Sequence, residues 1–105
     1  MKLKKELNPI RIWAQEKGIF EKGDVKTQYV KLQEEAGELA KAIMKSDKEE
    51  FIDAIGDCVV VLTNLAELGA KHFDTYFTIE DCINSAYSVI KDRTGKMEDG
   101  TFKKD

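Results

Sequence analysis

Apolar residues recur at intervals of three and four along most of this chain, the spacing of helices that bury one side. The clearest row is Tyr29, Leu32, Ala36, Leu39 and Ile43. The next segment carries two such rows on neighbouring sides, namely Phe51, Ile55, Cys58, Leu62 and Leu65, and then Ile52, Val59 and Ala66. A helix that is apolar on two sides needs cover on both, which in a short chain favours a second subunit.

Two further segments show the helical period. Ile10, Trp13 and Ala14 form a narrow apolar stripe in a helix expected from about Pro9 to Lys17. Asn8 can cap the free amides at its start, and proline fits the first helical position. A last helix is expected from a cap at Thr78 to near Thr94-Gly95, with its apolar side formed by Ile79, Cys82, Ile83, Ala86, Val89 and Ile90.

Turn and cap residues divide these segments. GIFEKGD, residues 18–24, reads as a loop whose last residue, Asp24, caps the second helix. The run Ser46-Asp47-Lys48-Glu49 has the pattern of a capping box, and Gly69 is expected to end the third helix. The short turn before the third helix makes the second and third helices an antiparallel hairpin. The pattern thus predicts an all-α fold: a four-helix antiparallel, bundle-like domain completed by oligomerisation.

The chain has 105 residues and a formal net charge of −3. This length suits a single domain over residues 1–105, with a short solvated start (1–7) and a polar tail (96–105) that is either disordered or a small flap. The negative charge gives no reason to expect a nucleic-acid partner.

The expected location is the cytoplasm, without a membrane partner. The longest apolar run, Cys58–Leu62, is far too short to span a bilayer, and no signal peptide precedes it. Cys58 and Cys82 lack metal-binding spacing and lie in apolar helical patterns, so we expect buried, reduced thiols.

Acidic residues interrupt the apolar sides of the predicted hairpin. Glu35 and Glu38 are three apart on one helix, and Asp53 and Asp57 are four apart on the next, so each pair projects from one side. Like charges at these spacings repel unless a cation lies between them. Carboxylates alone are ligands for hard cations, which predicts Mg²⁺, with Mn²⁺ as the alternative, over zinc.

A solvated charged face is the alternative interpretation of these acidic rows, because Lys31, Lys41 and Lys45 can pair with the glutamates. The only histidine, His72, is not at a Glu-x-x-His spacing, which argues against a di-iron carboxylate bundle.

Several motifs resemble a known family. The run EEAGE at Glu34–Glu38, then Gly56-Asp57, the apolar CVVVL and Asn64-Leu65-Ala66 are similar to the all-α nucleoside triphosphate pyrophosphohydrolases, the MazG-like superfamily. The resemblance covers about Trp13 to Leu68, and the ending IKDRTGKMEDGTF is similar to small phage-type members. The hallmark of the family is EExxE on one helix and ExxD on the next.

The first half of this hallmark matches at Glu34, Glu35 and Glu38, and the second half departs from it. If Asp57 fills the Asp position, then Ala54 stands where the family has Glu. The segment from Glu50 to Asp53 fits ExxD literally, but one helical turn too early and without the apolar run. We favour Asp57, with Asp53 supplying the missing carboxylate.

The resemblance implies Mg²⁺-dependent hydrolysis of a nucleoside or deoxynucleoside triphosphate to the monophosphate and pyrophosphate by an activated water, in a homo-oligomer (a dimer or a dimer of dimers). Glu34 or Glu35 is then the base, and the metal ligands are Glu35, Glu38, Asp53 and Asp57. Candidates for the phosphates are Lys31, Lys91, Arg93 and Lys96. Candidates for the base pocket are Trp13, Phe20, Asn84 and Tyr87.

A second function stays open from the sequence. Ala54 at the usual Glu position favours a non-catalytic helical module that keeps the fold and binds a nucleotide or a basic partner as a regulator. The intact EExxE favours the enzyme.

Overall fold

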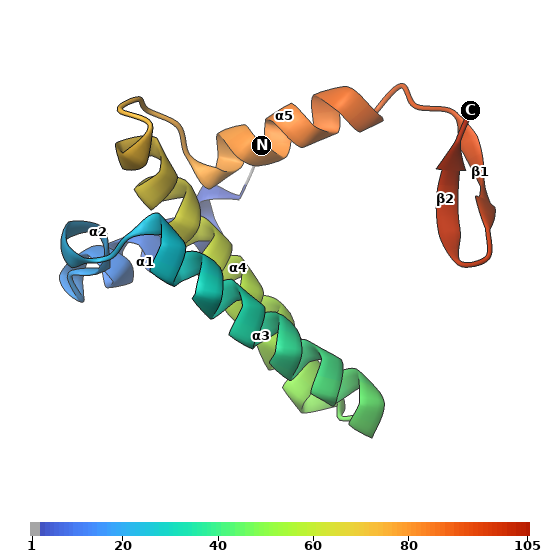
Figure 1. Cartoon of the computed structure of the whole chain (residues 1–105), viewed down its shortest axis with the longest axis horizontal. Coiled ribbons are helices and arrows are strands. Elements are labelled where there is room, and N and C mark those ends of the chain that lie inside the picture. The colour runs from blue at the N-terminus through green and yellow to red at the C-terminus, as the bar shows by residue number, and fades with distance from the viewer. Residues whose placement is uncertain (1–2) are drawn as a thin grey trace.

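A computed structural model describes residues 3–105, which form five helices and one two-stranded hairpin (Figure 1). The elements are α1 (Lys4–Glu16), α2 (Ile19–Lys22), α3 (Val25–Lys45), α4 (Lys48–His72), α5 (Ile79–Ile90), β1 (Gly95–Glu98) and β2 (Thr101–Lys104). The predicted all-α fold is confirmed, with four long helices, one short helix and a small terminal sheet.

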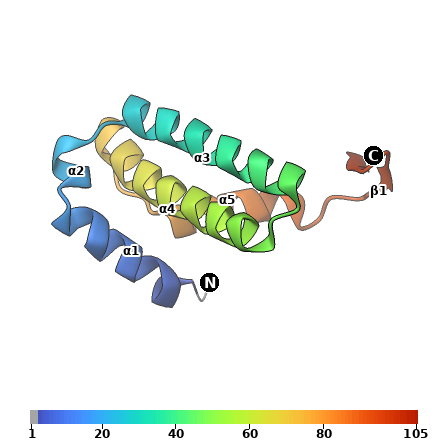
Figure 2. The same cartoon turned by 90° about the horizontal axis from the view of Figure 1, so that it is seen from below.

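The antiparallel α3/α4 hairpin is the centre of the fold (Figures 1 and 2). Asp24 caps α3 as predicted, accepting a hydrogen bond of 2.8 Å from the backbone amide of Thr27. The predicted capping box at Ser46 is wrong by one residue. Ser46 ends α3 in a left-handed conformation, with φ 53°, and Asp47 caps α4 by accepting from the amide of Glu50.

The helix α1 begins before the predicted start at Pro9. It starts at Lys4 and holds Pro9 inside, and the side chain of Asn8 accepts a hydrogen bond from Arg11 where a cap had been expected. Leu7 explains the difference, because this buried side chain needs the first turn to be helical. The solvated segment predicted over residues 1–7 therefore does not include Leu7.

Three other boundaries differ from the sequence predictions. The helix α4 passes through Gly69, where the ring of Phe77 packs, and ends at His72. Residues 19–22 form the short helix α2 inside the predicted loop. The capping box at Thr78 and Asp81 starts α5 as predicted, but α5 ends at Ile90, before Thr94.

The core is small and surrounds α4, which contacts α1, α2, α3 and α5 (Figure 2). Small side chains let these helices approach closely, and the buried apolar residues are Leu7, Ala14, Ala42, Ala54, Val61, Ala66, Leu68 and Ala70. Among residues 3–105, no helix is long and apolar enough to cross a bilayer.

The apolar rows predicted as buried are largely exposed in one chain. The side of α3 towards α4 has a heptad spacing that includes Leu32, Glu35, Leu39 and Ala42. Tyr29 and Ile43 lie beside this seam and are each more than half exposed. Phe51, Ile55 and Leu62 of α4 are also exposed, as is Cys82 on α5, whose predicted burial is therefore wrong for the single chain.

The chain ends in an arm. The helix α5 projects away from the α3/α4 hairpin, and the β1/β2 hairpin stands at its far end (Figure 1). Its strands pair Met97 with Phe102 and turn at Asp99-Gly100, where both residues have positive φ. Two consecutive residues with positive φ form a type I′ turn, whose twist matches the twist of the two strands that it joins. The tail predicted to be disordered or a flap is an ordered hairpin.

Candidate active site

The acidic residues of α3 differ in their surroundings. Glu35 lies in the seam with α4, with its side chain only 16% exposed, whereas Glu34 and Glu38 are exposed on the adjoining side. The heptad explains this difference, because Glu35 occupies a seam position between Leu32 and Leu39. A half-buried carboxylate flanked by two exposed ones is what EExxE produces on this helix.

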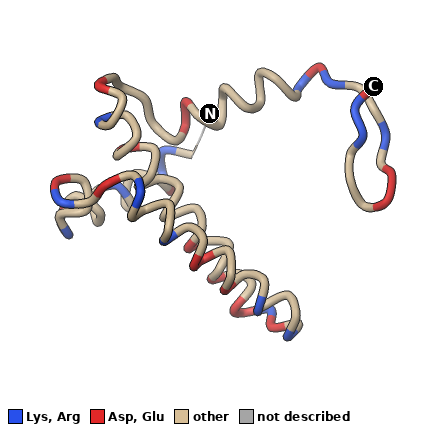
Figure 3. The backbone as a smooth tube through the Cα atoms, in the orientation of Figure 1, with Lys and Arg blue, Asp and Glu red and all other residues tan. Residues whose placement is uncertain are grey.

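The pairing of α3 with α4 sets which acidic residues face each other. Val25 and Leu68 line one pocket, and Ala42 and Phe51 line another near the turn. The two helices have the same number of residues between these two pairs. Counting residues from either pair therefore puts Asp57 level with the part of α3 between Glu35 and Glu38. Helical periodicity directs Glu38 and Asp57 to the same side of the hairpin. Figure 3 shows Asp and Glu recurring along this part of α3 and α4.

A pocket of about 390 Å³ lies beside Asp57. It is lined mainly by apolar atoms of α1 and α4, from Pro9, Ile10, Trp13, Asp57 and Val60. The structure thus brings Trp13, predicted to contact a base, next to Asp57, predicted to bind a metal. An exposed indole at a carboxylate-edged apolar pocket can stack on a planar ring.

Lysines pair with the glutamates of α3. Lys31 lies 3.3 Å from Glu34 and 3.7 Å from Glu35, and Lys41 lies 3.5 Å from Glu38. The hydrogen bond to Glu34 raises the pKa of Lys31. These pairs are the ones that a solvated charged face would use, and exposed pairs of this kind contribute little stability.

The carboxylates do not converge closely in the single chain. Within residues 3–105, no group of three or more His, Cys, Asp or Glu side chains is near enough to hold a metal ion. The ion pairs of the same residues include neither Asp53 nor Asp57. Glu35, Glu38 and Asp57 therefore share a side of the hairpin without a closed ligand cage.

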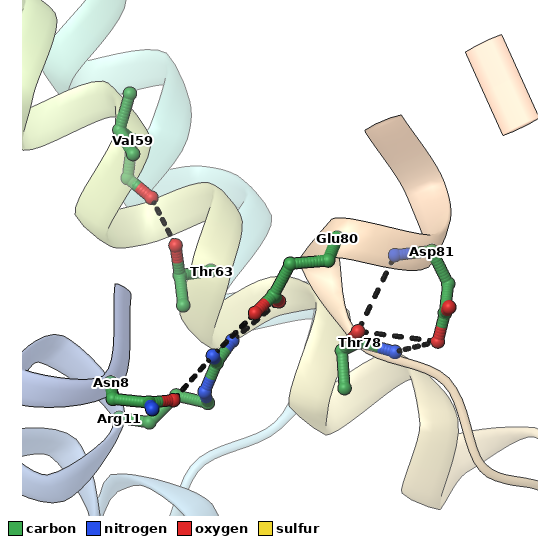
Figure 4. Close-up of polar contacts among 7 residues, drawn as sticks. All are labelled: Asn8, Arg11, Val59, Thr63, Thr78, Glu80 and Asp81. Atoms are coloured by element: carbon green, nitrogen blue, oxygen red, sulfur yellow. Dashed lines mark hydrogen bonds and ion pairs between the residues drawn. The ribbon is translucent and has the colours of Figure 1, made fainter. Parts of the chain in front are cut away.

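A second polar centre joins α1 to α5 (Figure 4). The Arg11 guanidinium donates two hydrogen bonds, of 2.7 and 2.6 Å, to the buried carboxylate of Glu80. This contact lowers the pKa of Glu80 to about 2, against an ordinary value of 4.5. Nearby on α4, burial raises the pKa of Glu67.

This centre borders a pocket of about 460 Å³ that includes Asn84, predicted to bind substrate. Arg11, Glu67 and Glu80 of this centre were not predicted from the sequence. One signal was available: Leu7, Arg11 and Ala14 share one side of a helix, so Arg11 falls among residues that are buried.

The remaining predicted substrate residues do not meet the acidic side of their own chain. Tyr87 is exposed on α5, and Lys91, Arg93 and Lys96 belong to the arm, which stands apart from α3 and α4 (Figures 1 and 2). Phe20 lies in α2, where its carbonyl oxygen accepts a hydrogen bond from Lys71.

A family model described as the MazG nucleotide pyrophosphohydrolase domain matches residues 23–97. The chain belongs to this family. The match begins just before α3 and runs into β1, so it includes every acidic residue of the candidate site.

One similar protein comes from Haemophilus phage HP1 (strain HP1c1), where it is described as an uncharacterized 18.2 kDa protein in the rep-hol intergenic region. It is 34% identical over 73 residues, covering 70% of this chain and 44% of the phage protein. The chain therefore spans less than half the length of this relative. No solved structure matches the chain.

Proposed function

We propose that this protein is a Mg²⁺-dependent nucleoside triphosphate pyrophosphohydrolase, which hydrolyses a (d)NTP to a (d)NMP and pyrophosphate. The observation that supports it most is the pocket between Trp13 and Asp57, in a chain whose MazG match covers α3 and α4. An apolar pocket for a ring beside carboxylates for a phosphate-bound cation is the arrangement that such a substrate needs.

The donor set fits a hard divalent cation. Glu35, Glu38, Asp53 and Asp57 offer only oxygen ligands, which suits Mg²⁺ or Mn²⁺. Glu35 is the least exposed side chain of the α3 acidic row, and Asp57 lies at its level on α4. We propose these two as the main ligands, with Glu38 and Asp53 completing the set. When bound, the cation offsets the negative charge of the triphosphate and polarises its phosphorus centres.

The roles of the other side chains follow from their exposure. Glu34 is exposed next to Glu35 and can take a proton from an attacking water, which makes it the preferred base. Lys31, held between Glu34 and Glu35, is free to turn to a phosphate when the substrate arrives. Trp13 stacks on the base in its pocket.

We also propose that the protein is a homo-oligomer. Tyr29 and Ile43 of α3 and Ile55 and Leu62 of α4 are exposed, and helical periodicity puts them on the side of the hairpin opposite the acidic residues. A contiguous apolar side of this kind marks a protein interface. Two hairpins packed through these sides form a four-helix bundle with an acidic side facing outwards on each copy.

Pyrophosphate release from the eight standard NTPs and dNTPs, with and without Mg²⁺, tests the proposal. We expect Mg²⁺-dependent release from at least one nucleotide, its loss in Glu35→Gln, and a raised KM in Trp13→Ala. Glu98→Gln, on the distant hairpin, is the matched control and should keep full activity. No release from any nucleotide, with nucleotide binding retained, would favour the non-catalytic regulator for which Ala54 argues.

A further inference from the structure

We propose that Arg11 is a positioning residue for the apolar pocket at Trp13. Through its ion pair with Glu80, Arg11 fixes the rotation of α1 about its own axis and so holds the Trp13 ring beside Asp57. The effect on the pocket follows from the fold alone, whereas its consequence for nucleotide affinity rests on the proposed function.

The helix α1 packs on α4 and borders two pockets (Figure 2). Its buried residues are Leu7 and Ala14. Helical periodicity puts Arg11 on one flank of this buried side, and Trp13, about 200° further round the helix, on the other flank. Accordingly, Arg11 lines the polar pocket of about 460 Å³ and Trp13 lines the apolar pocket of about 390 Å³. Any rotation of α1 therefore changes both pockets at once.

The buried side of α1 does little to set this rotation. Ala14 is 0% exposed, but its side chain ends at Cβ and cannot interlock with the side chains of α4. Leu7 contributes apolar burial, which is favourable but has no preferred direction. A directional contact is needed to select one orientation of the helix.

The ion pair of Arg11 with Glu80 supplies this direction (Figure 4). Its two hydrogen bonds, of 2.7 and 2.6 Å, join a planar guanidinium to both carboxylate oxygens, which restricts orientation as well as distance. Asn8 holds the guanidinium on its own helix by accepting a further hydrogen bond of 2.7 Å. On the other side, the capping box of Thr78 and Asp81 fixes the first turn of α5, which carries Glu80. The contact is thus anchored at both ends.

A small rotation of α1 is enough to disturb the apolar pocket. Side-chain ends lie about 5–6 Å from a helix axis, so a rotation of about 20° moves them by about 2 Å. Asp57 and Val60, across the pocket, belong to α4 and do not move with α1. Dispersion contacts weaken strongly within about 1 Å of extra separation, so a ring between the two helices would lose one of its walls. The shape of this pocket therefore depends on Arg11, which lies in the other pocket.

The fluorescence of Trp13 tests the proposal, because it is the only tryptophan of the chain. Arg11→Met with Glu80→Met removes the directional contact and fills the space with apolar side chains, a replacement that is often neutral for stability. We expect the acrylamide quenching constant to rise about 1.5-fold, because an indole that is 45% exposed loses cover. Lys4→Gln, which removes a positive charge from the same polar pocket, is the matched control and should leave quenching unchanged.

Two further variants separate orientation from stability. Arg11→Lys keeps the charge without the planar fork, so it should also raise the quenching constant. Asp47→Ala removes the cap at the start of α4 and should lower the Tm without raising it. If thermal melts show that the double methionine variant does not fold, Arg11→Lys decides. Unchanged quenching in the folded Arg11 variants, or an equal rise in Lys4→Gln or Asp47→Ala, would overturn the proposal.

The consequence for nucleotide affinity is measured separately, with the best substrate of the eight. In Arg11→Met with Glu80→Met, KM should rise about tenfold, the effect of losing a base-stacking contact, while kcat and the half-saturating Mg²⁺ concentration stay unchanged. A purely structural defect would instead lower the active fraction, and so kcat, at constant KM. Raised quenching with an unchanged KM would overturn the role of Arg11 in nucleotide affinity. A wild-type chain inactive on every nucleotide would reject the proposed function, and quenching would still decide whether Arg11 positions Trp13.

Discussion

Arg11 and Glu80 lie 69 positions apart in the chain, yet the guanidinium of one holds both carboxylate oxygens of the other, at 2.7 and 2.6 Å. Both side chains are largely buried, at 16% and 8% exposure. Together with the contacts of α5 on α4, this ion pair holds the start of α5 against the other helices.

Glu80→Gln should destabilise the protein by about 3–5 kcal/mol at pH 7, because it leaves the buried Arg11 without its counter-charge. The folded-state pKa of Glu80, about 2, lies below its ordinary 4.5. The pair therefore contributes fully above pH 4.5, and its contribution falls as the pH drops towards 2. Chemical denaturation of both proteins from pH 7 to pH 2 should show the gap narrowing. A gap that stays constant would contradict the assignment, and Glu98→Gln should cost at most about 1 kcal/mol.

Glu67→Gln should have the opposite effect and raise the Tm at pH 7. Burial raises the pKa of Glu67 in the folded state, so ionising it costs folding free energy. A group of this kind stabilises the fold below its unfolded pKa and loses that contribution as the pH rises through the folded pKa. The advantage of glutamine should therefore vanish near pH 4. Thermal melts at pH 4 and pH 8 measure it, and a lower Tm for the variant at pH 8 would contradict the prediction.

Asp47→Ala should cost about 1 kcal/mol, since Asp47 caps α4. Ser46→Gly should instead stabilise the protein by up to about 1 kcal/mol, because glycine relieves the left-handed conformation at that residue. Thr78→Ala, which removes the cap of α5, is the positive control. Urea denaturation distinguishes this assignment from a cap at Ser46, for which Ser46→Ala would cost as much as Asp47→Ala does here.

The register of the acidic site on α4 can be tested by single amides. Asp57→Asn should abolish pyrophosphate release, because an amide is neutral and a weaker ligand for a hard cation. Asp53→Asn should weaken Mg²⁺ binding, and Glu50→Gln should matter little, because Glu50 lies nearer the turn than Glu35 and Glu38 do. Initial rates across a Mg²⁺ titration decide this. Loss of activity in Glu50→Gln, with activity retained in Asp57→Asn, would show that the metal site lies two helical turns closer to the start of α4 than Asp57.

Ala54→Glu should make stability depend on divalent cations. Ala54 is buried in the seam with α3, so a carboxylate there is destabilising unless a cation binds it. Without Mg²⁺ the Tm should fall well below that of the wild type, and millimolar Mg²⁺ should restore much of the loss by binding the folded state alone. Ala54→Gln is the matched control, with similar size and no charge. An equal response of both variants to Mg²⁺ would show that residue 54 lies away from the metal.

The helices were predictable because their apolar periodicity is local, and the caps at Asp24 and Thr78 follow from the same local chemistry. The sequence also contains a signal for the β1/β2 hairpin, because Asp99-Gly100 lies between two short segments that include Met97 and Phe102. The polar composition of the tail concealed this signal. The start of α1 was missed because the burial of Leu7 depends on α4, which no local pattern records.

Helical spacing alone directs Glu35, Glu38, Asp53 and Asp57 towards one side of the hairpin, and their role as metal ligands stays a prediction. The contact of Trp13 with the Asp57 pocket and the pairing of Arg11 with Glu80 depend on how α1 lies across α4. The predicted placement of Lys91, Arg93 and Lys96 near the acidic side of the same chain ignored the direction of α5. That direction depends on contacts between segments far apart in the sequence, namely the Arg11–Glu80 pair and the packing of α5 on α4. The cytoplasmic location and the oligomeric state stay predictions.

The sequence distance between Arg11 and Glu80 also orders the steps of folding. The α3/α4 and β1/β2 hairpins join neighbouring segments and close short loops, so they can form within microseconds. The Arg11–Glu80 pair joins residues 69 positions apart and contributes nothing until both ends are in place. During synthesis, Arg11 can therefore meet this partner only after the segment that carries Glu80, 69 positions later, has been made. The docking of α5 beside α1 and α4 joins segments far apart in the sequence, so we expect it to form after the two hairpins.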